Sequence, residues 1–140
     1  MLLPCFTLTM EIDEVFTKKH VDKWTKAWND HNLEEILSFY CEKILFRSPN
    51  VKLVYRGQSS TTLINKTELK EYFSLGLKKY PNLHFIPVEY FLKNQTIIFE
   101  YYCRPDGKIQ WSVLEKFDLN DQGLISKSEV YYGAEEQYHI

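Results

Sequence analysis

The sequence has few of the residues from which cofactor and metal sites are usually built. Only five of its 140 residues are glycine, and no glycine-rich phosphate loop occurs among them. Its four histidines are widely separated, with no His-x-His pair, and its three cysteines include no Cys-x-x-Cys pair. We therefore expect the protein to hold no metal ion and to need no cofactor.

Nucleic acid and membranes are not expected partners. The net charge is −2 and basic residues occur singly or in pairs, so no electrostatic footprint for nucleic acid is present. No apolar run approaches a membrane-spanning length, and residues 1–9 lack the basic start of a signal peptide, so Met10 is an alternative first residue. The odd number of cysteines, at positions 5, 41 and 103, favours free thiols in a reducing compartment such as the cytoplasm.

Aromatic residues, by contrast, are abundant. The chain has ten Tyr, nine Phe and three Trp, or 16% of its residues. Such side chains fill large cores, and they also line apolar pockets and subunit interfaces. Since 140 residues fit one domain, we expect one core that leaves some aromatic side chains for a pocket or an interface.

The first part of the chain has helical spacing. Apolar side chains fall on one face over residues 16–30, which predicts an amphipathic helix. Asn32 then caps a second helix, with Glu35 as its capping-box partner and an apolar stripe that reaches Tyr40. Almost no loop separates the two helices, so we expect them to pack as a tight hairpin.

A short strand, an irregular segment and a third helix are predicted next. Ile44–Arg47 combines strong strand formers and is followed by Ser48-Pro49, so the strand is expected to end at the proline. The less regular segment that follows favours another short strand near Lys52–Tyr55. A third helix is predicted from Asn65 to about Tyr80, where a proline follows.

The remaining residues predict an antiparallel meander. Its four β runs are separated by hairpin signals, and they are His84 to Lys93, Thr96 to Arg104, Ile109 to Leu119 and Leu124 to Tyr132. If Lys93 pairs with Thr96, an apolar face is shared by Ile86, Val88, Tyr90, Leu92, Ile97, Phe99, Tyr101 and Cys103.

The loop at Pro105-Asp106-Gly107 decides which residues of the next strand join that face. A three-residue loop adds Ile109, Trp111, Val113, Glu115 and Phe117, whereas a two-residue loop adds Gln110, Ser112, Leu114 and Lys116, which fit badly. We prefer the first register, which places one carboxylate, Glu115, on an otherwise apolar face. The opposite face mixes charges with aromatic side chains, which favours cover by a second subunit and thus a homodimer.

The order of these elements and several short segments resemble a known superfamily. The matching segments are AWNDHNLEEILSFY, FRSP, RGQSSTTLINKTELKEYFSLGL, PNLHF, and LEKFDLNDQGLI followed by VYYG. In order and spacing they are similar to the SnoaL-like proteins of the nuclear-transport-factor-2-like superfamily, which includes ketosteroid isomerases and polyketide cyclases. The resemblance covers residues 17–133, leaving 1–16 as an N-terminal extension and 134–140 as a C-terminal tail.

This resemblance implies a fold and a site. The implied fold is α+β, with three N-terminal helices packed in a curved, twisted antiparallel sheet around a cone-shaped apolar cavity. Ketosteroid isomerases use a tyrosine, an aspartate base before a proline and a protonated aspartate, and these positions correspond to Trp24, Ser48 and Glu115. A serine hydroxyl is no base near neutral pH without an activating partner, and an indole N–H donates no proton. The resemblance therefore implies a chain that departs from standard ketosteroid isomerase chemistry.

Glu115 and His84 are the candidate catalytic residues. A carboxylate facing an apolar cavity has a raised pKa and can act as an acid, a base or a ligand anchor. The alternative is that Glu115 reaches solvent at the cavity mouth, or pairs with Arg47 or His84. His84 begins a strand on the predicted inner face, where it either forms an acid–base pair with Glu115 or only bonds to its surroundings.

Candidate ligand contacts are one serine and several aromatic residues. Ser48 either satisfies a backbone group at the strand end or touches a ligand. Most aromatic side chains are expected in the core, and those we assign to the ligand site are Trp24, Tyr72, Tyr101, Trp111 and Tyr132.

Two functions are compatible with this sequence. In the first, the cavity binds a small hydrophobic or carbonyl-containing molecule, with cofactor-independent isomerase, cyclase or lyase chemistry centred on Glu115. In the second, the chain is a non-catalytic ligand-binding or dimerising module whose cavity is filled by its own aromatic side chains.

Overall fold

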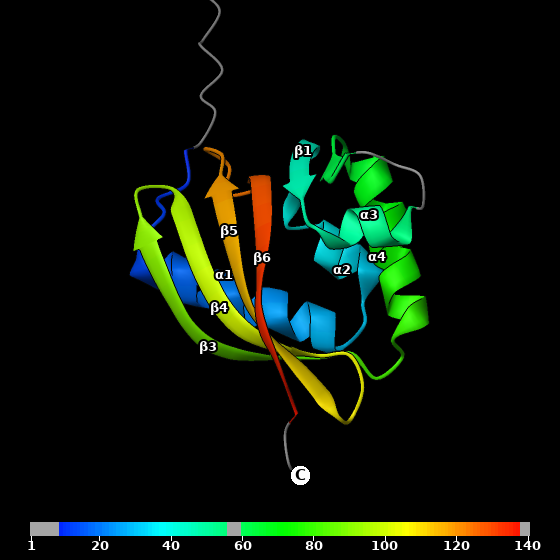
Figure 1. The fold of residues 1–140 in the computed structure, drawn as a ribbon. Coiled ribbons are helices and arrows are strands. Elements are labelled where there is room, and N and C mark those ends of the chain that lie inside the picture. Colours follow the sequence, from blue (N-terminus) through cyan, green and yellow to red (C-terminus); the bar gives the residue numbers. More distant parts are fainter. Residues whose placement is uncertain (1–8, 56–59, 138–140) are drawn as a thin grey trace, which may run out of the picture.

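A curved sheet and the helices packed against it make up the fold (Figure 1). The computed structural model describes residues 9–55 and 60–137. The helices are α1 (Glu14–Asn29), α2 (Leu33–Leu37), α3 (Asn50–Val54) and α4 (Lys66–Lys79). The strands are β1 (Tyr40–Arg47), β2 (Thr62–Leu63), β3 (His84–Lys93), β4 (Thr96–Arg104), β5 (Ile109–Leu119) and β6 (Ile125–Gln137). Within the described chain, no helix is both long and apolar enough to cross a membrane.

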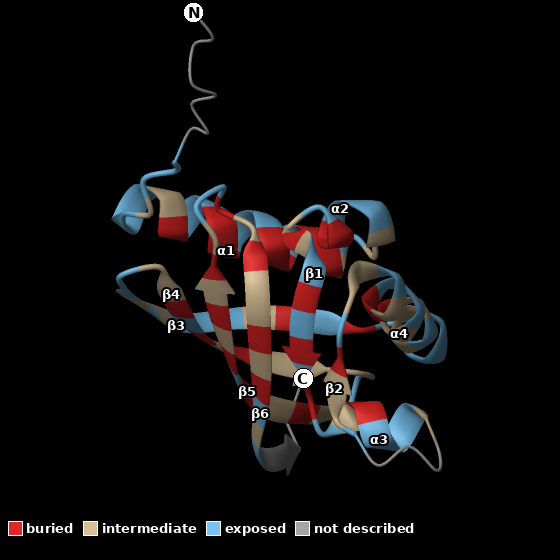
Figure 2. Ribbon diagram, turned by 90° about the horizontal axis from the view of Figure 1, so that it is seen from above, coloured by how far each residue is buried: buried red, intermediate tan, exposed pale blue. Residues whose placement is uncertain are grey.

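The strands form one six-stranded sheet in the order β2-β1-β6-β5-β4-β3. The meander from β3 to β6 is antiparallel, as predicted. However, β1 runs parallel to β6, and the long connection that a parallel pair requires is supplied by α3, α4 and the meander. Helix α1 lies across the sheet, and Figure 2 shows its buried positions turned toward the strands.

The first two helices form where the sequence predicted, but the second is shorter. Asp13 caps α1 by accepting a hydrogen bond from the Phe16 amide at 2.8 Å, and Asn32 caps α2 through the Glu35 amide at 3.1 Å. Helix α2 has only five residues. The prediction that Tyr40 continues its stripe is wrong, because strand β1 already begins at Tyr40 and places its side chain in the core.

The predicted strand near Lys52–Tyr55 is also wrong. The segment forms helix α3, whose N-cap Pro49 has φ −55° and ψ −30°, values compatible with a helix start. The second short strand, β2, comes later and pairs Leu63 with Phe46. The third predicted helix is confirmed as α4, and Asn65 caps it by accepting from the Glu68 amide at 2.8 Å.

The inward faces of the meander strands are confirmed on both sides of β4. Lys93 pairs with Thr96 as predicted. Phe99 pairs with Glu115, two residues from the Val113 partner that a Pro105–Gly107 loop would give, and a shift of two keeps Glu115 on the predicted face. The exception is a bulge in β3 between Pro87 and Glu89. There the prediction for the start of β3 fails, because the bulge turns Phe85 inward at 7% exposure and leaves Val88 at 46%. Pro87 has no amide hydrogen, so a break in the ladder at this position is expected.

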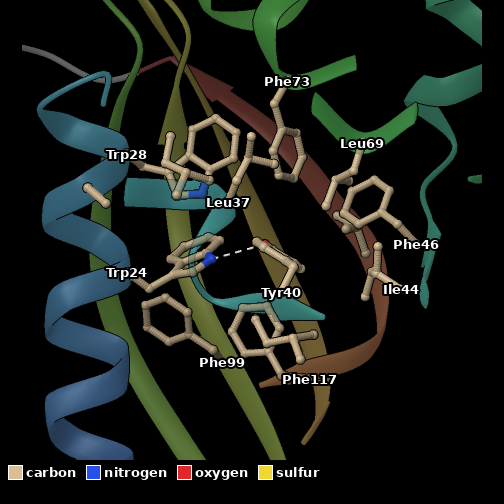
Figure 3. Close-up of a cluster of buried hydrophobic side chains, with 14 of the residues drawn as sticks. Trp24, Trp28, Leu37, Tyr40, Ile44, Phe46, Leu69, Phe73, Phe99 and Phe117 are labelled. Carbon is tan, nitrogen blue, oxygen red and sulfur yellow. Dashed lines mark hydrogen bonds between the residues drawn. The ribbon is translucent and has the colours of Figure 1, made fainter. Parts of the chain in front are cut away.

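An aromatic core fills the space between α1, α4 and the sheet (Figure 3). Trp24 lies at its centre with 1% of its surface exposed, and its ring contacts those of Phe85, Phe99, Tyr101 and Phe117. The centroid separations of these pairs are 5.4–5.7 Å, the range of favourable edge-to-face and offset contacts. Trp24 is therefore a central contact of α1 with the inner face.

A side-chain clip holds the end of α1 against the edge strand. The Asn29 amide donates to the Phe85 carbonyl at 2.9 Å and its oxygen accepts from the Phe85 N–H at 2.7 Å. Asn29 thus replaces a neighbouring strand for one residue of β3, beside the bulge. This satisfies two backbone groups that would otherwise lose their partners.

We expect Asn29→Ala to lower the free energy of unfolding by about 2 kcal/mol, because it leaves both backbone groups of Phe85 unpaired. Chemical denaturation measures the change. Asp30→Ala is the matched control, since the neighbouring side chain is exposed and its change is expected within about 0.5 kcal/mol. Equal effects of the two substitutions would contradict the clip.

Candidate functional site

Glu115 lies on the inner face of β5, in the interior of the fold. It sits between Phe99 of β4 and Val130 of β6, and only 3% of its surface is exposed. The alternative in which Glu115 reaches solvent is therefore wrong. Neighbouring residues on the same face of β5, Val113 and Phe117, are buried as well, so the carboxylate is surrounded by apolar side chains.

Two hydroxyl groups bind the Glu115 carboxylate. The Tyr101 Oη donates to Oε1 at 2.8 Å, and the Ser128 Oγ donates to Oε2 at 2.8 Å. Within residues 9–55 and 60–137, no lysine, arginine or histidine forms an ion pair with Glu115. The predicted alternative partner Arg47 instead lies 3.9 Å from Glu129, with 57% of its side chain exposed. Glu115 is thus a buried carboxylate held only by neutral donors.

His84 is not part of this site. The prediction that it faces the inner side is wrong, because the bulge in β3 turns Phe85 inward and leaves His84 exposed on the other side of the strand. Side chains of adjacent residues in a strand point to opposite faces. The structure therefore does not bring His84 and Glu115 together as an acid–base pair.

Burial changes the acidity of Glu115. Loss of hydration raises the pKa of its carboxyl to about 7, while the hydrogen bonds from Ser128 and Tyr101 act in the opposite direction. Near neutral pH the residue is therefore present in both the protonated and the ionised form. Such a pKa suits a general acid or base, since the group can release and accept protons under the same conditions.

Trp24 reaches this region but serves the core. Its indole Nε1 donates to the Tyr40 Oη at 3.1 Å, a bond drawn in Figure 3. Burial and the nearby Glu115 charge raise the pKa of the Tyr40 phenol, so Tyr40 stays protonated. Tyr101 is held in the same way, and its pKa is also raised by burial and by Glu115.

The other predicted ligand contacts form a second cluster, which we call the Ser48 cluster: Ser48, Asn50, Tyr72, Trp111 and Tyr132. The Ser48 hydroxyl lowers the pKa values of the Tyr72 and Tyr132 phenols, against the effect of burial, and Asn50 Nδ2 donates to the Tyr132 Oη at 2.8 Å. The Trp111 and Tyr132 rings meet edge to face at 6.2 Å. Burial raises the pKa of Tyr72 to about 12 and also raises that of Tyr132.

The Ser48 cluster lies near Glu115, and its aromatic members are more exposed than Glu115. Its phenols feel the Glu115 charge, which contributes to their raised pKa values. Ser48 is buried at 1% exposure, whereas Tyr72, Trp111 and Tyr132 are only half-buried. Ser48 also accepts from the Asn50 amide at 3.3 Å, so the structural role predicted for it, at the end of the strand, is present alongside its contacts with the phenols.

Sequence reasoning missed three members of the site. Ser128, Asn50 and Tyr40 each bond one of the groups described above. Ser128 could have been predicted from the two-residue alternation of a strand, since it lies four residues before Tyr132 on the inner face of β6. Asn50 and Tyr40 could not have been predicted in this way, because their positions depend on α3 and on the early start of β1.

Two hollows on the surface lie away from Glu115. One, of about 290 Å³, is on the outer sheet face and is lined by Phe91, Lys93, Asn94, Thr96, Ile98 and Lys116. The other, of about 650 Å³, lies between α2 and α4 and is lined by Leu33, Glu34, Leu37, Ser38, Lys66 and Lys70. In the part of the chain that the structure describes, no group of three or more His, Cys, Asp or Glu side chains is arranged to hold a metal ion.

The fold resembles several solved structures. A SnoaL-like protein of unknown function from Burkholderia thailandensis is 24% identical, with a TM-score of 0.79 over 88% of this chain and 98% of that one. A nuclear-transport-factor-2-like protein from Anabaena variabilis is 15% identical, with a TM-score of 0.67 over 84% and 87% of the two chains. The epoxide hydrolase/cyclase-like enzyme SalBIII is 14% identical, with a TM-score of 0.70 over 90% and 98%.

These comparisons confirm the nuclear-transport-factor-2-like fold that the sequence resemblance implied, a largely antiparallel α+β architecture. No model of a protein family matches the sequence, and no curated protein matches it. At these identities the comparisons establish the fold alone, and function has to be argued from the site.

Glu115→Gln should remove a pH dependence of stability. The folded-state pKa of about 7 lies above the ordinary 4.5, so the folded protein holds this proton more tightly than the unfolded chain. The stabilisation of the folded protein by this proton is complete below about pH 4.5 and is lost as the pH rises to about 7. At about 1.4 kcal/mol per pH unit, the loss is about 3 kcal/mol.

The uncharged glutamine side chain escapes this loss, so the variant should be the more stable protein at about pH 8, with a smaller difference at about pH 5. Urea denaturation at several pH values measures both. Glu100→Gln, on the outer face of β4, is the control and should keep the wild-type dependence of the unfolding free energy on pH. A Glu115→Gln variant with that same dependence would show that Glu115 does not titrate in this range.

Proposed function

We propose that this chain, which has the nuclear-transport-factor-2-like fold, binds a small, mainly apolar or carbonyl-containing molecule beside Glu115 and exchanges a proton with it. The observation that carries the proposal is a fully buried carboxylate, held by Tyr101 and Ser128, without a cationic partner in the described chain.

A purely structural role does not account for this residue. A buried carboxylate loses its hydration and recovers only part of that loss from two neutral hydrogen bonds. A glutamine at position 115 would make comparable bonds without the charge. Strongly shifted carboxyl groups in such surroundings are typical of functional sites, where the stability cost is retained for chemistry.

The chemistry this site supports is cofactor-independent acid–base catalysis. With a pKa of about 7, Glu115 can remove a proton from carbon beside a carbonyl and return it elsewhere. Tyr101 stays protonated, so its hydroxyl can donate a hydrogen bond to Glu115 before and after the proton transfer. Isomerisation, cyclisation and dehydration all need such a proton transfer. Ser48 stands where ketosteroid isomerases have their base, so the standard isomerase reaction is not proposed.

The route to Glu115 runs through the Ser48 cluster. Trp24, Phe99 and Phe117 close the inner part of the cone, whereas Tyr72, Trp111 and Tyr132 are half-buried. A ligand would enter by displacing these three aromatic side chains and would be in contact with them when bound. The fold is compatible with such chemistry, since the similar enzyme SalBIII has a role in pyran ring formation in the polyether salinomycin.

The ligand-binding proposal is tested by thermal shift against a library of small cyclic ketones and other apolar carbonyl compounds. At least one class should raise the melting temperature of the wild type, and Glu115→Gln should reduce the shift several-fold. Glu100→Gln, on the outer face, should retain it. A shift that Glu115→Gln leaves unchanged would remove Glu115 from the site, and no shift with any compound would favour the second function below.

The second candidate function, a dimerising module, is favoured by the outer sheet face. Large apolar side chains are exposed there: Val88, Phe91, Ile98, Leu114 and Tyr131, at 40–55% exposure. We propose that a second copy of the chain covers this face, because several large apolar side chains exposed on one face of a sheet are typical of an interface. The free thiols of Cys41 and Cys103 support a reducing compartment such as the cytoplasm.

Phe91→Glu should therefore convert a dimer to a monomer, because it places a charge on the apolar face that the second copy would cover. Light scattering coupled to size-exclusion chromatography measures the mass. Val15→Glu changes a similarly exposed apolar residue on α1, away from the sheet face, and should leave the dimer intact. A wild type that is monomeric at high concentration would contradict the proposal.

A further inference from the structure

We propose that the ligand of this site is a small organic cation, an alkylammonium ion, held between the aromatic rings of the Ser48 cluster and the charge of Glu115. This inference rests on the proposed function, because it narrows the small, mainly apolar molecule of that site to one that carries a cationic group.

The charges in the interior select against anions. The buried polar side chains of the described chain are Thr17, His20, Thr25, Ser48, Gln110, Glu115 and Ser128. None is a lysine or arginine, and burial lowers the pKa of His20 to about 4, so His20 is neutral at physiological pH. Among these described side chains, the only charge available in the interior is negative. An anion would meet repulsion from the ionised form of Glu115, whereas a cation supplies the partner that this form lacks.

The walls of the site suit a cation as well. Tyr72, Trp111 and Tyr132 are half-buried aromatic side chains, and the Trp111 and Tyr132 rings meet edge to face at 80°. Alkylammonium groups bind against aromatic rings because each ring face carries partial negative charge.

Two of the aromatic rings are also held in place before a ligand arrives. Asn50 donates to the Tyr132 Oη at 2.8 Å, and the Tyr72 ring packs against Phe46 and Phe73. These contacts fix the ring positions, so less ordering is left for the ligand to bring about.

The hydrogen bonds at Glu115 favour an alkylated ion over a primary amine. Each carboxylate oxygen already accepts a hydroxyl, from Tyr101 and from Ser128. A primary ammonium has three donors that all need acceptors once it leaves water. A tertiary or quaternary ion brings its charge with one donor or none and covers it with methyl groups that pack on the rings.

Among the described groups around the site, only Glu115 titrates between about pH 5 and about pH 9. The phenols that face it from β1, α4, β4 and β6 all have raised pKa values: Tyr40, Tyr72, Tyr101 and Tyr132. Nearby Cys103 has a pKa raised to about 12, and His20 of α1 is already neutral. The affinity for a permanently charged ligand should therefore follow the ionisation of Glu115.

The experiment compares choline with its carbon isostere, in which a tert-butyl group replaces the trimethylammonium group, by isothermal titration calorimetry. The two probes share shape and differ in charge. We expect choline to bind at least about tenfold more tightly than the isostere, and about tenfold more tightly at about pH 8 than at about pH 6. Choline itself does not titrate in this range, so the pH dependence reports on the protein.

Two variants and a control separate the contributions. Glu115→Gln should abolish the preference for charge and the pH dependence, and Trp111→Leu should weaken choline more than the isostere. Glu100→Gln, on the outer face, should bind both probes as the wild type does. Circular dichroism confirms that each variant is folded. If Glu115→Gln does not fold, Trp111→Leu still tests the proposal.

Each outcome bears on one proposal or on both. Equal binding of the two probes, or binding of the isostere and of carbonyl compounds without choline, would overturn the cation assignment and leave the ligand-binding function standing. A choline preference that survives Glu115→Gln would also overturn it. Absence of binding by choline, the isostere and the carbonyl library would reject the cation and the proposed function together.

Discussion

The burial of one carboxylate among aromatic rings is the constraint on which the rest of the structure depends. Trp24 packs against Phe85, Phe99, Tyr101 and Phe117, and this packing removes the inner face of the sheet from water. Glu115 lies on that face, so its charge is destabilised by the same contacts that stabilise the fold. Stability and acidity are therefore coupled, because any side chain that improves the core around Glu115 also raises the pKa of its carboxyl.

The backbone is arranged so that this face stays continuous. The register across β4 and β5 places Glu115 beside Phe99, and the bulge at Pro87 brings Phe85 inward where the unbroken strand would have exposed it. Asn29 then occupies the hydrogen-bonding positions of Phe85, which lies at the edge of the sheet. The bulge and the clip act together, since one directs the ring onto Trp24 and the other fixes the backbone that carries it.

Regular parts of this architecture could be predicted from the sequence because they follow from periodicity. The bounds of β3, β4 and β5 and the inward side of Glu115 came from alternation and from one loop length. The bulge could not be predicted, because a proline breaks a ladder without stating which neighbour turns inward. For this reason His84 was wrongly predicted to lie on the inner face. Helix α3 was missed because Val51, Leu53 and Val54 favour a strand reading, and tertiary contact of Val51 overrides it.

The chemistry of the site follows from what surrounds a single ionisable group. Four phenols and a thiol near Glu115 all have raised pKa values, and the interior imidazole of His20 has a lowered one. Burial thus neutralises these groups and leaves Glu115 alone among them to change charge near pH 7. A serine at position 48 is consistent with this arrangement, since a second carboxylate there would repel the first and raise both pKa values. Among these described groups, the interior therefore offers a single one that carries either a negative charge or a proton near pH 7.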